Sequence, residues 1–166
     1  MLPYYILGAT RIIWKNQIYL PIVEEKVIVA KEKAEIHEKL SGSETILVVE
    51  DEETILDLIE VVLKQSGYDL ITARDGQDAI NKVQGFEGPI HLLLTDVVMP
   101  NLSGKDLSVE IRKRHPETKI CFMSGYTDNA IVHHDILDEN TNFIQKPFLP
   151  SFLLKKVREI LDRKTI

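Results

Sequence analysis

Asp96 ends an apolar run, "LLLTD", and the loop sequence "VVMPNLSG" follows it at once. A buried carboxylate is costly unless a cation or hydrogen-bond donors compensate its charge. Two more carboxylates, Glu50 and Asp51, follow the apolar run "TILVV", and Lys146 follows "NFIQ". Carboxylate oxygens are ligands that Mg²⁺ prefers, and an aspartate can itself form an acyl phosphate. These residue types indicate a Mg²⁺ site at which Asp96 could take a phosphoryl group while Lys146 offsets charge.

The chain from residue 44 onward alternates between short apolar runs, typical of strands, and segments with helical spacing of apolar residues. The predicted strands cover residues 45–49, 69–73, 91–95, 119–123 and 142–145. The predicted helices cover residues 52–66, 75–84, 103–114, 127–137 and 150–162. This alternation predicts an α/β fold, a doubly wound five-stranded parallel sheet with helices on both faces. Right-handed crossovers favour the flavodoxin-like strand order 2-1-3-4-5.

In that order the third strand lies between the first and the fourth, and ligands bind outside the carboxyl ends of the strands. Asp96 then occupies the middle of the site, with Glu50 and Asp51 on one side. Ser124, from "MSGY", and Lys146 lie on the other side. Three carboxylates in one crevice repel each other, which a divalent cation relieves. The Ser124 hydroxyl could donate a hydrogen bond to a phosphoryl oxygen.

Composition and charge exclude several classes of function. The net charge is −6, and residues 44–166 carry 14 Lys and Arg against 21 Asp and Glu. Because phosphate contacts need basic residues, we expect no binding to nucleic acid. The single cysteine, Cys121 in "KICFM", excludes an internal disulfide and predicts a buried thiol and a cytoplasmic location. Arg11 and Lys15 interrupt the apolar start of the chain, so neither a membrane segment nor a signal peptide is predicted.

Residues 1–43 differ from the alternating part of the chain. They end in the charged stretch "KVIVAKEKAEIHEKLSGSE", whose Ser-Gly-Ser is typical of a linker. The sequence therefore predicts two parts, an N-terminal extension and linker over residues 1–43 and a globular domain over residues 44–166.

The motifs "ILVVEDEE", "LLLTDVVMPNLSG", "CFMSGYTD" and "NFIQKPF" resemble, in this order, those of receiver domains of two-component response regulators. The resemblance covers about residues 44–163. It implies that Asp96 is the phosphoacceptor and that Asp51 binds Mg²⁺ directly, with Glu50 acting beside it directly or through water. Val98 is implied to offer its backbone carbonyl to the metal.

The same resemblance assigns the remaining site residues. Ser124 matches the hydroxyl residue that moves toward the phosphoryl group, and Lys146 matches the lysine that pairs with it, followed by a cis bond to Pro147. Phe143 matches the aromatic residue that turns inward after phosphorylation. The chain departs from the commoner pattern by its Glu-Asp acidic pair, and by Phe in place of Tyr at the switch position, which removes a phenolic hydroxyl.

The stretch "MSGYTDNAIVHHDILDENTNFIQKPF" is most similar to receivers at the C-terminus of hybrid sensor histidine kinases, and "NQIYLP" resembles the last strand of a kinase ATP-binding domain. Residues 1–43 are then expected to be a remnant of that domain, without the kinase catalytic core. The expected partner is a histidine kinase or a histidine phosphotransfer protein. No DNA-binding domain is expected after the last helix, so output is expected by protein contact or phosphoryl relay. The last strand-helix face is a candidate dimer surface.

Other interpretations of the same residues stay open. A Mg²⁺-dependent phosphohydrolase with an aspartate nucleophile would usually carry a second Asp at the position of Val98. A pseudo-receiver would bind proteins without taking phosphate. Locally, Glu50 and Asp51 could cap the following helix, Ser124 could be a turn serine and Lys146 a surface lysine. The predicted role is a phosphoacceptor signalling domain that is not an enzyme beyond slow self-phosphorylation and self-dephosphorylation.

Overall fold

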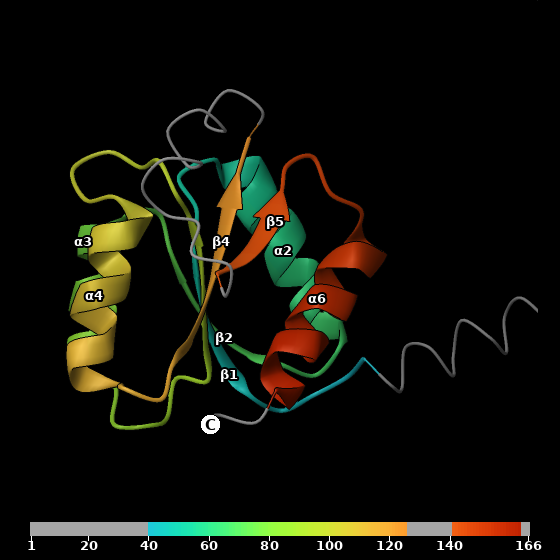
Figure 1. Cartoon of the computed structure of the whole chain (residues 1–166), viewed down its shortest axis with the longest axis horizontal. Coiled ribbons are helices and arrows are strands. Elements are labelled where there is room, and N and C mark those ends of the chain that lie inside the picture. The colour runs from blue at the N-terminus through green and yellow to red at the C-terminus, as the bar shows by residue number, and fades with distance from the viewer. Residues whose placement is uncertain (1–39, 126–140, 164–166) are drawn as a thin grey trace, which may run out of the picture.

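The computed structural model describes residues 40–125 and 141–163, which form a parallel sheet covered by helices (Figure 1). The strands are β1 (Thr45–Val49), β2 (Asp69–Ala73), β3 (Leu92–Asp96), β4 (Lys119–Ser124) and β5 (Asn142–Gln145). They pair in the order β2-β1-β3-β4-β5, and every pairing is parallel. The predicted fold class and strand order are therefore confirmed.

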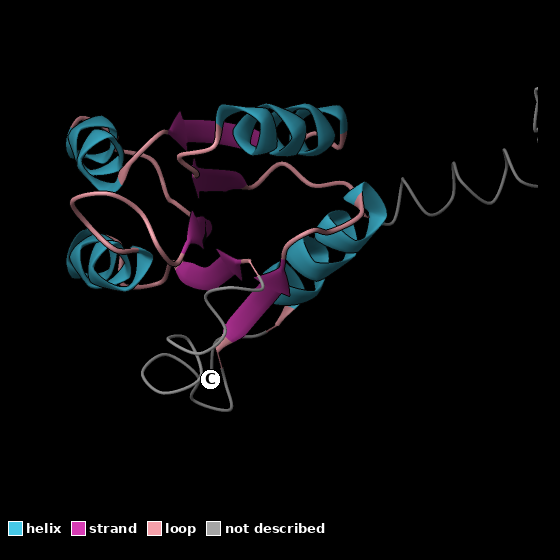
Figure 2. Ribbon diagram, turned by 90° about the horizontal axis from the view of Figure 1, so that it is seen from above, coloured by secondary structure: helices cyan, strands magenta, loops and turns pink. Residues whose placement is uncertain are grey.

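Helices cover the two faces of the sheet in pairs. Helices α2 (Glu53–Gln65) and α6 (Pro150–Asp162) lie on one face, and α3 (Gly76–Gln84) and α4 (Gly104–Arg114) lie on the other (Figure 2). Successive strand residues point to opposite faces, so Ile46 packs with the α2/α6 core and Leu47 with the α3/α4 core. Burial on both faces explains why the strands are continuous apolar runs.

The ends of several elements differ from the prediction by one residue. Helices α3 and α4 begin one residue later than predicted, because Asp75 and Ser103 are caps whose side chains accept the amides of Asp78 and Asp106. Strand β3 covers residues 92–96, so Asp96 is its last residue. The helix predicted over 127–137 lies outside the described residues.

Two further sequence predictions concern the core and the membrane. Cys121 is fully buried in the α2/α6 core, and burial raises the pKa of its thiol to about 12. The thiol is therefore protonated and unreactive in the folded protein. Among the residues that the structure describes, no helix combines the length and the apolar character needed to cross a membrane.

A two-pronged ion pair lies at the amino edge of the sheet, just before β1. Arg158 of α6 reaches Glu44 with Nη2–Oε1 at 2.7 Å and Nη1–Oε2 at 3.2 Å. Burial acts to raise the pKa of the Glu44 carboxyl, but the hydrogen bonds and charge of Arg158, with backbone amides, outweigh it and leave the pKa below its usual value.

Replacing Glu44→Gln tests this pair, and we expect a loss of about 1 kcal/mol in the free energy of unfolding near pH 7. A carboxyl with a lowered pKa in the folded state stabilises the fold above its unfolded pKa and loses that effect as the pH falls through the folded pKa. Urea unfolding of both proteins from about pH 7 to about pH 4 should therefore show a shrinking difference. A difference that stays constant over this range would contradict the ionic interpretation.

Candidate functional site

The register of the sheet brings the first two predicted site residues together. Val49 of β1 pairs with Thr95 of β3, so Glu50, the next residue, reaches the level of Asp96. Glu50 and Asp96 leave adjacent parallel strands at the same edge, and both are buried. The carboxylates that the sequence places at separate strand ends therefore meet at the carboxyl edge of the sheet.

The register also brings the residues at the ends of β4 and β5 to this edge of the sheet. Asp96 pairs with Met123, and Ser124 pairs with Gln145, so Lys146 follows one position later. The backbone carbonyl of Ser124 accepts the amide of Lys146 at 2.7 Å. The bond from Lys146 to Pro147 is cis, as the resemblance predicts.

The ammonium of Lys146 lies between two buried carboxylates. Its Nζ donates a hydrogen bond to Asp96 Oδ2 at 2.6 Å and forms an ion pair with Glu50 Oε2 at 2.6 Å. Among the described residues, no donor other than Lys146 reaches the buried Glu50 Oε2. One positive charge is thus shared by two negative charges.

This imbalance explains the pKa directions of the pair. Burial raises the pKa of the Glu50 carboxyl, and its ion pair with Lys146 only partly opposes that rise. Burial acts to lower the pKa of the Lys146 ammonium, but its hydrogen bond to the Asp96 carboxylate and its contact with Glu50 outweigh burial and raise the pKa. Lys146 has two anionic partners, whereas Glu50 has only one cationic partner, Lys146, which also pairs with Asp96.

A third carboxylate completes the acidic cluster. One oxygen each from Glu50, Asp51 and Asp96 lie within 4.8 Å of one another, and the Asp51 side chain is exposed to solvent. Carboxylate oxygens alone make up this donor set, which suits a hard divalent cation such as Mg²⁺. The buried Glu50 Oε2, which only the Lys146 ammonium contacts in the described chain, fits the same ligand chemistry.

Backbone groups fix the position of Asp96. The amide of Val98 donates to Asp96 Oδ1 at 3.3 Å, and the hydroxyl of Thr95 donates to the Asp96 carbonyl at 3.0 Å. Gly104 begins α4 against the same carbonyl, and a Cβ there would collide with the carbonyl oxygen. Thr95 and Gly104 are not among the predicted site residues, although the Ser-Gly after the Pro-containing loop marks a close approach of this kind.

The remaining predicted residues lie nearby with different surroundings. Ser124 is fully buried, and its hydroxyl contacts the carbonyl of Gly125 at 3.3 Å. Phe143 pairs with Phe122 across β4 and β5 and packs, partly buried, against the α3/α4 core. The roles of Ser124 and Phe143 in a switch, and the metal contact of the Val98 carbonyl, stay predictions.

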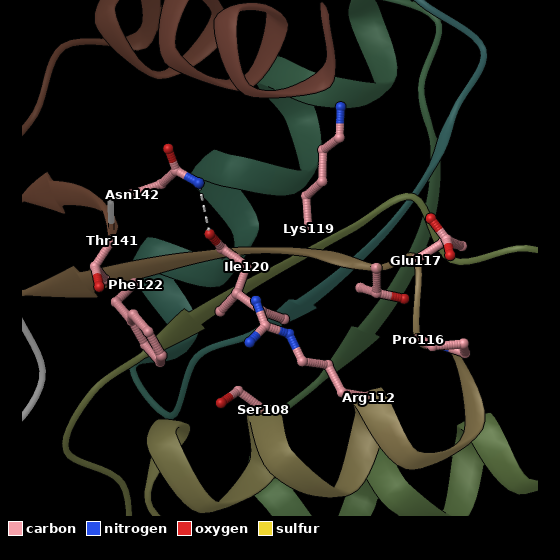
Figure 3. A pocket seen from close by; sticks show the side chains of 10 residues that line it. Ser108, Arg112, Pro116, Glu117, Lys119, Ile120, Phe122, Thr141 and Asn142 are labelled. Atoms are coloured by element: carbon pink, nitrogen blue, oxygen red, sulfur yellow. Dashed lines mark hydrogen bonds between the residues drawn. The ribbon is translucent and has the colours of Figure 1, made fainter. Parts of the chain in front are cut away.

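A cavity of about 400 Å³ lies away from this cluster, on the α4 side of β4 and β5 (Figure 3). Arg112 points toward Ile120 at its centre, and Asn142 donates its amide hydrogen to the Ile120 carbonyl. None of the predicted site residues lines it. The candidate site is therefore the carboxylate and ammonium cluster at the carboxyl edge.

Replacing Lys146→Met should lower the free energy of unfolding by about 3 kcal/mol near pH 7, because it leaves Glu50 and Asp96 buried and uncompensated. The matched control is Lys64→Met, since the Lys64 side chain is 57% exposed and its pair with Glu60 is a surface contact. The control should change stability by about 0.5 kcal/mol or less. Equal losses in urea unfolding of the two variants would contradict the structural importance of the buried pair.

Comparisons with known proteins agree with this geometry. The family model described as response regulator receiver domain matches residues 46–158. Sensor kinase CckA of Brucella abortus is 36% identical over 155 residues, covering 89% of this chain and 16% of that protein. Response regulator RR06 of Streptococcus pneumoniae is 33% identical, covering 71% of this chain and 53% of that protein. The chain thus spans about half or less of the length of these relatives.

Solved structures give the same result. A response regulator receiver domain protein from Clostridium thermocellum aligns with a TM-score of 0.61 and 29% identity, covering 72% of this chain and 94% of that one. The BeF3-activated DrrB receiver domain aligns with a TM-score of 0.62 and 29% identity, covering 74% of this chain and all of that one. With more than half of its length matched by the family model, this chain belongs to the response regulator receiver domains of two-component systems.

Proposed function

We propose that Asp96 receives a phosphoryl group from a phosphohistidine of a partner histidine kinase or histidine phosphotransfer protein. The observation that carries this proposal is the placement of Lys146 Nζ 2.6 Å from both Asp96 and Glu50, beside the exposed carboxylate of Asp51. A nucleophilic carboxylate, a fixed cation and a set of metal ligands then meet at one edge of the sheet. Phosphoryl transfer depends mainly on such positioning and charge compensation.

In the proposed reaction an Asp96 carboxylate oxygen bonds to phosphorus as the P–N bond of the phosphohistidine breaks. The electron pair of that bond stays on the imidazole, and Asp96 becomes an acyl phosphate. Lys146 holds one Asp96 oxygen and the Val98 amide holds the other, which fixes the carboxylate plane before attack. Ser124 stands one residue beyond the strand position paired with Asp96, where its hydroxyl can meet a phosphoryl oxygen after a small rotation.

Glu50, Asp51 and Asp96 would hold Mg²⁺, with the Val98 carbonyl as the further ligand. When bound, the ion would neutralise charge on the transferring phosphoryl group. An exposed Asp51 supports this role, because its side chain has no hydrogen-bond or ion-pair partner in the part of the chain that the structure describes. A purely structural ion pair between Lys146 and its two buried partners would not need this third carboxylate.

The alternatives are less well supported by the site. A phosphohydrolase needs an acid-base group beside the nucleophile, and Val98, whose surface is 48% exposed, offers only apolar atoms at that position. A protein-binding module that never takes phosphate gains nothing from burying two carboxylates around one ammonium at the cost of desolvation.

The chain's wider setting follows from its relatives. The alignment with the Brucella sensor kinase covers 89% of the chain, which is more than residues 40–166 provide, so it includes part of the first 39 residues. We infer that residues 1–43 correspond to a segment that precedes the receiver in a larger sensor kinase. Output is then cytoplasmic, through protein contact or phosphoryl relay, with the β4, β5 and α6 face as the contact or dimer surface.

Incubation with acetyl phosphate and Mg²⁺ should add about 80 Da to the intact protein, the mass of one phosphoryl group. The adduct should be absent from Asp96→Asn, because the amide cannot attack phosphorus. Intact-protein mass spectrometry reads both results. Rapid release of inorganic phosphate without an adduct would favour the hydrolase, and neither adduct nor release would favour the binding module.

Mg²⁺ binding can be tested separately from phosphorylation. Asp51→Asn should weaken Mg²⁺ binding about tenfold or more, since carboxylate charge sets the affinity of such sites. The matched control is Asp57→Asn, because Asp57 is exposed on α2 outside the cluster. Titration of backbone amide NMR shifts with MgCl₂ measures both affinities. Equal affinities in the two variants would exclude Asp51 as a ligand.

A further inference from the structure

Residues 40–44, which precede β1, are bound tightly to the domain, and we call this segment the strap. The Leu40 carbonyl accepts the Tyr68 hydroxyl at 2.9 Å, and the Gly42 amide donates to the Ser66 carbonyl at 3.1 Å. Leu40 also packs against the α2/α6 core. The close fit extends to Gly42, where a Cβ would lie 2.5 Å from a ring carbon of Tyr68. The strap is thus part of the folded domain, although its sequence is typical of a linker.

Arg158 of α6 also contacts the strap. Besides its two contacts with Glu44, its Nη1 donates to the Ser41 carbonyl at 3.4 Å. The Arg158 side chain is only 15% exposed. This guanidinium, which is largely removed from water, also pairs with Asp162 of α6, and its contacts with two strap residues fix where the strap meets α6.

The opposite end of α6 lies next to the candidate site. Lys146 contacts Asp96 and Glu50, and α6 begins at Pro150, only four positions later. Phe148, between them, packs against the α2/α6 core together with buried residues of α6. Lys146, which contacts Asp96, therefore lies four residues before α6, and Arg158, which contacts the strap, lies in the C-terminal half of the same helix.

A phosphoryl group added to Asp96 would change the electrostatic forces on Lys146. Its negative charge draws Lys146 away from Glu50 toward the carboxyl edge, because the ammonium is attracted to the larger charge. We expect the short connection to Pro150 to pass that displacement to α6 and to move Arg158 away from the strap at the amino edge. The buried apolar side of α6 slides as a unit because packed helices shift rather than deform.

We propose that the strap couples the upstream segment, residues 1–39, to the phosphorylation state of Asp96 through Lys146, α6 and Arg158. This inference rests on the proposed phosphorylation of Asp96. Phosphorylation weakens the contacts of Arg158 with Ser41 and Glu44 and so releases the strap from α6. By reciprocity, release of the strap favours the phosphorylated state by the same factor.

The test uses the full chain with Mg²⁺ and beryllofluoride, a mimic of the phosphoryl group, and reads amide hydrogen exchange by mass spectrometry. Saturating beryllofluoride should raise the exchange rate of peptides over residues 40–44 about fivefold, the lower end of usual coupling strengths. Protection of peptides around Asp96 reports binding itself. Arg158→Met should lose the strap response and bind beryllofluoride about fivefold more tightly.

Two further variants test whether the response depends on the ion pair between Arg158 and Glu44. Glu44→Gln should reproduce the effect of Arg158→Met, because each breaks the same ion pair, and the double variant should add nothing. Arg112→Met removes an exposed arginine of α4 that has no ion-pair partner in the described chain, and it should retain the wild-type strap response. Thermal unfolding verifies that every variant is folded.

The outcomes separate the two proposals. Protection around Asp96 without a change in the strap would overturn the coupling and leave the proposed function intact. The absence of beryllofluoride binding in the wild-type chain would overturn the proposed function and this inference with it. A strap response that persists in both Arg158→Met and Glu44→Gln would overturn the role of the ion pair as the coupling contact.

Discussion

The site depends on one ammonium held between two buried carboxylates. Lys146 compensates Glu50 and Asp96 at once, with Nζ at 2.6 Å from an oxygen of each. Burying charges is costly, and the shared cation only partly offsets that cost, as the raised pKa of Glu50 shows. The chain retains this imbalance next to a third, exposed carboxylate, Asp51. This surplus of negative charge at a fixed position supports the proposed role of the site in binding Mg²⁺ and accepting a phosphoryl group.

The parallel sheet makes this imbalance possible. All five of its parallel strands end at one edge, and the register sets the residues at the ends of β1, β3, β4 and β5 at nearly the same level. The covering helices bury both faces, so the strand ends cannot move independently. Gly104 lets α4 begin against the Asp96 backbone at this edge. The position of the site is thus a property of the whole fold.

Much of this was predictable from sequence because the fold has a simple pattern. Strands buried on both faces give continuous apolar runs, and polar residues directly after them must lie at the carboxyl edge. Asp96, Glu50 and Lys146 could be placed together on that ground. The predicted starts of α3 and α4 are one residue too early, because the caps Asp75 and Ser103 continue the polar pattern of the helices that they precede.

Other features depend on three-dimensional contacts that no local pattern carries. Adjacent residues Glu50 and Asp51 are alike in sequence, but only Glu50 turns into the sheet to meet Lys146. The ion pair between Glu44 and Arg158 joins residues 114 positions apart. Residues 40–43 of the strap belong to the predicted linker because Ser-Gly-Ser is typical of one, whereas contacts with Tyr68 and Arg158 bind them to the domain.

A crystal structure of the chain with Mg²⁺ and beryllofluoride tests the central claim most directly. Our account predicts beryllium bonded to an Asp96 oxygen, the metal ion among Glu50, Asp51 and Asp96, and Lys146 Nζ shifted from Glu50 to a fluoride. Beryllium bound elsewhere, or Lys146 still paired with Glu50 beside an occupied Asp96, would contradict it.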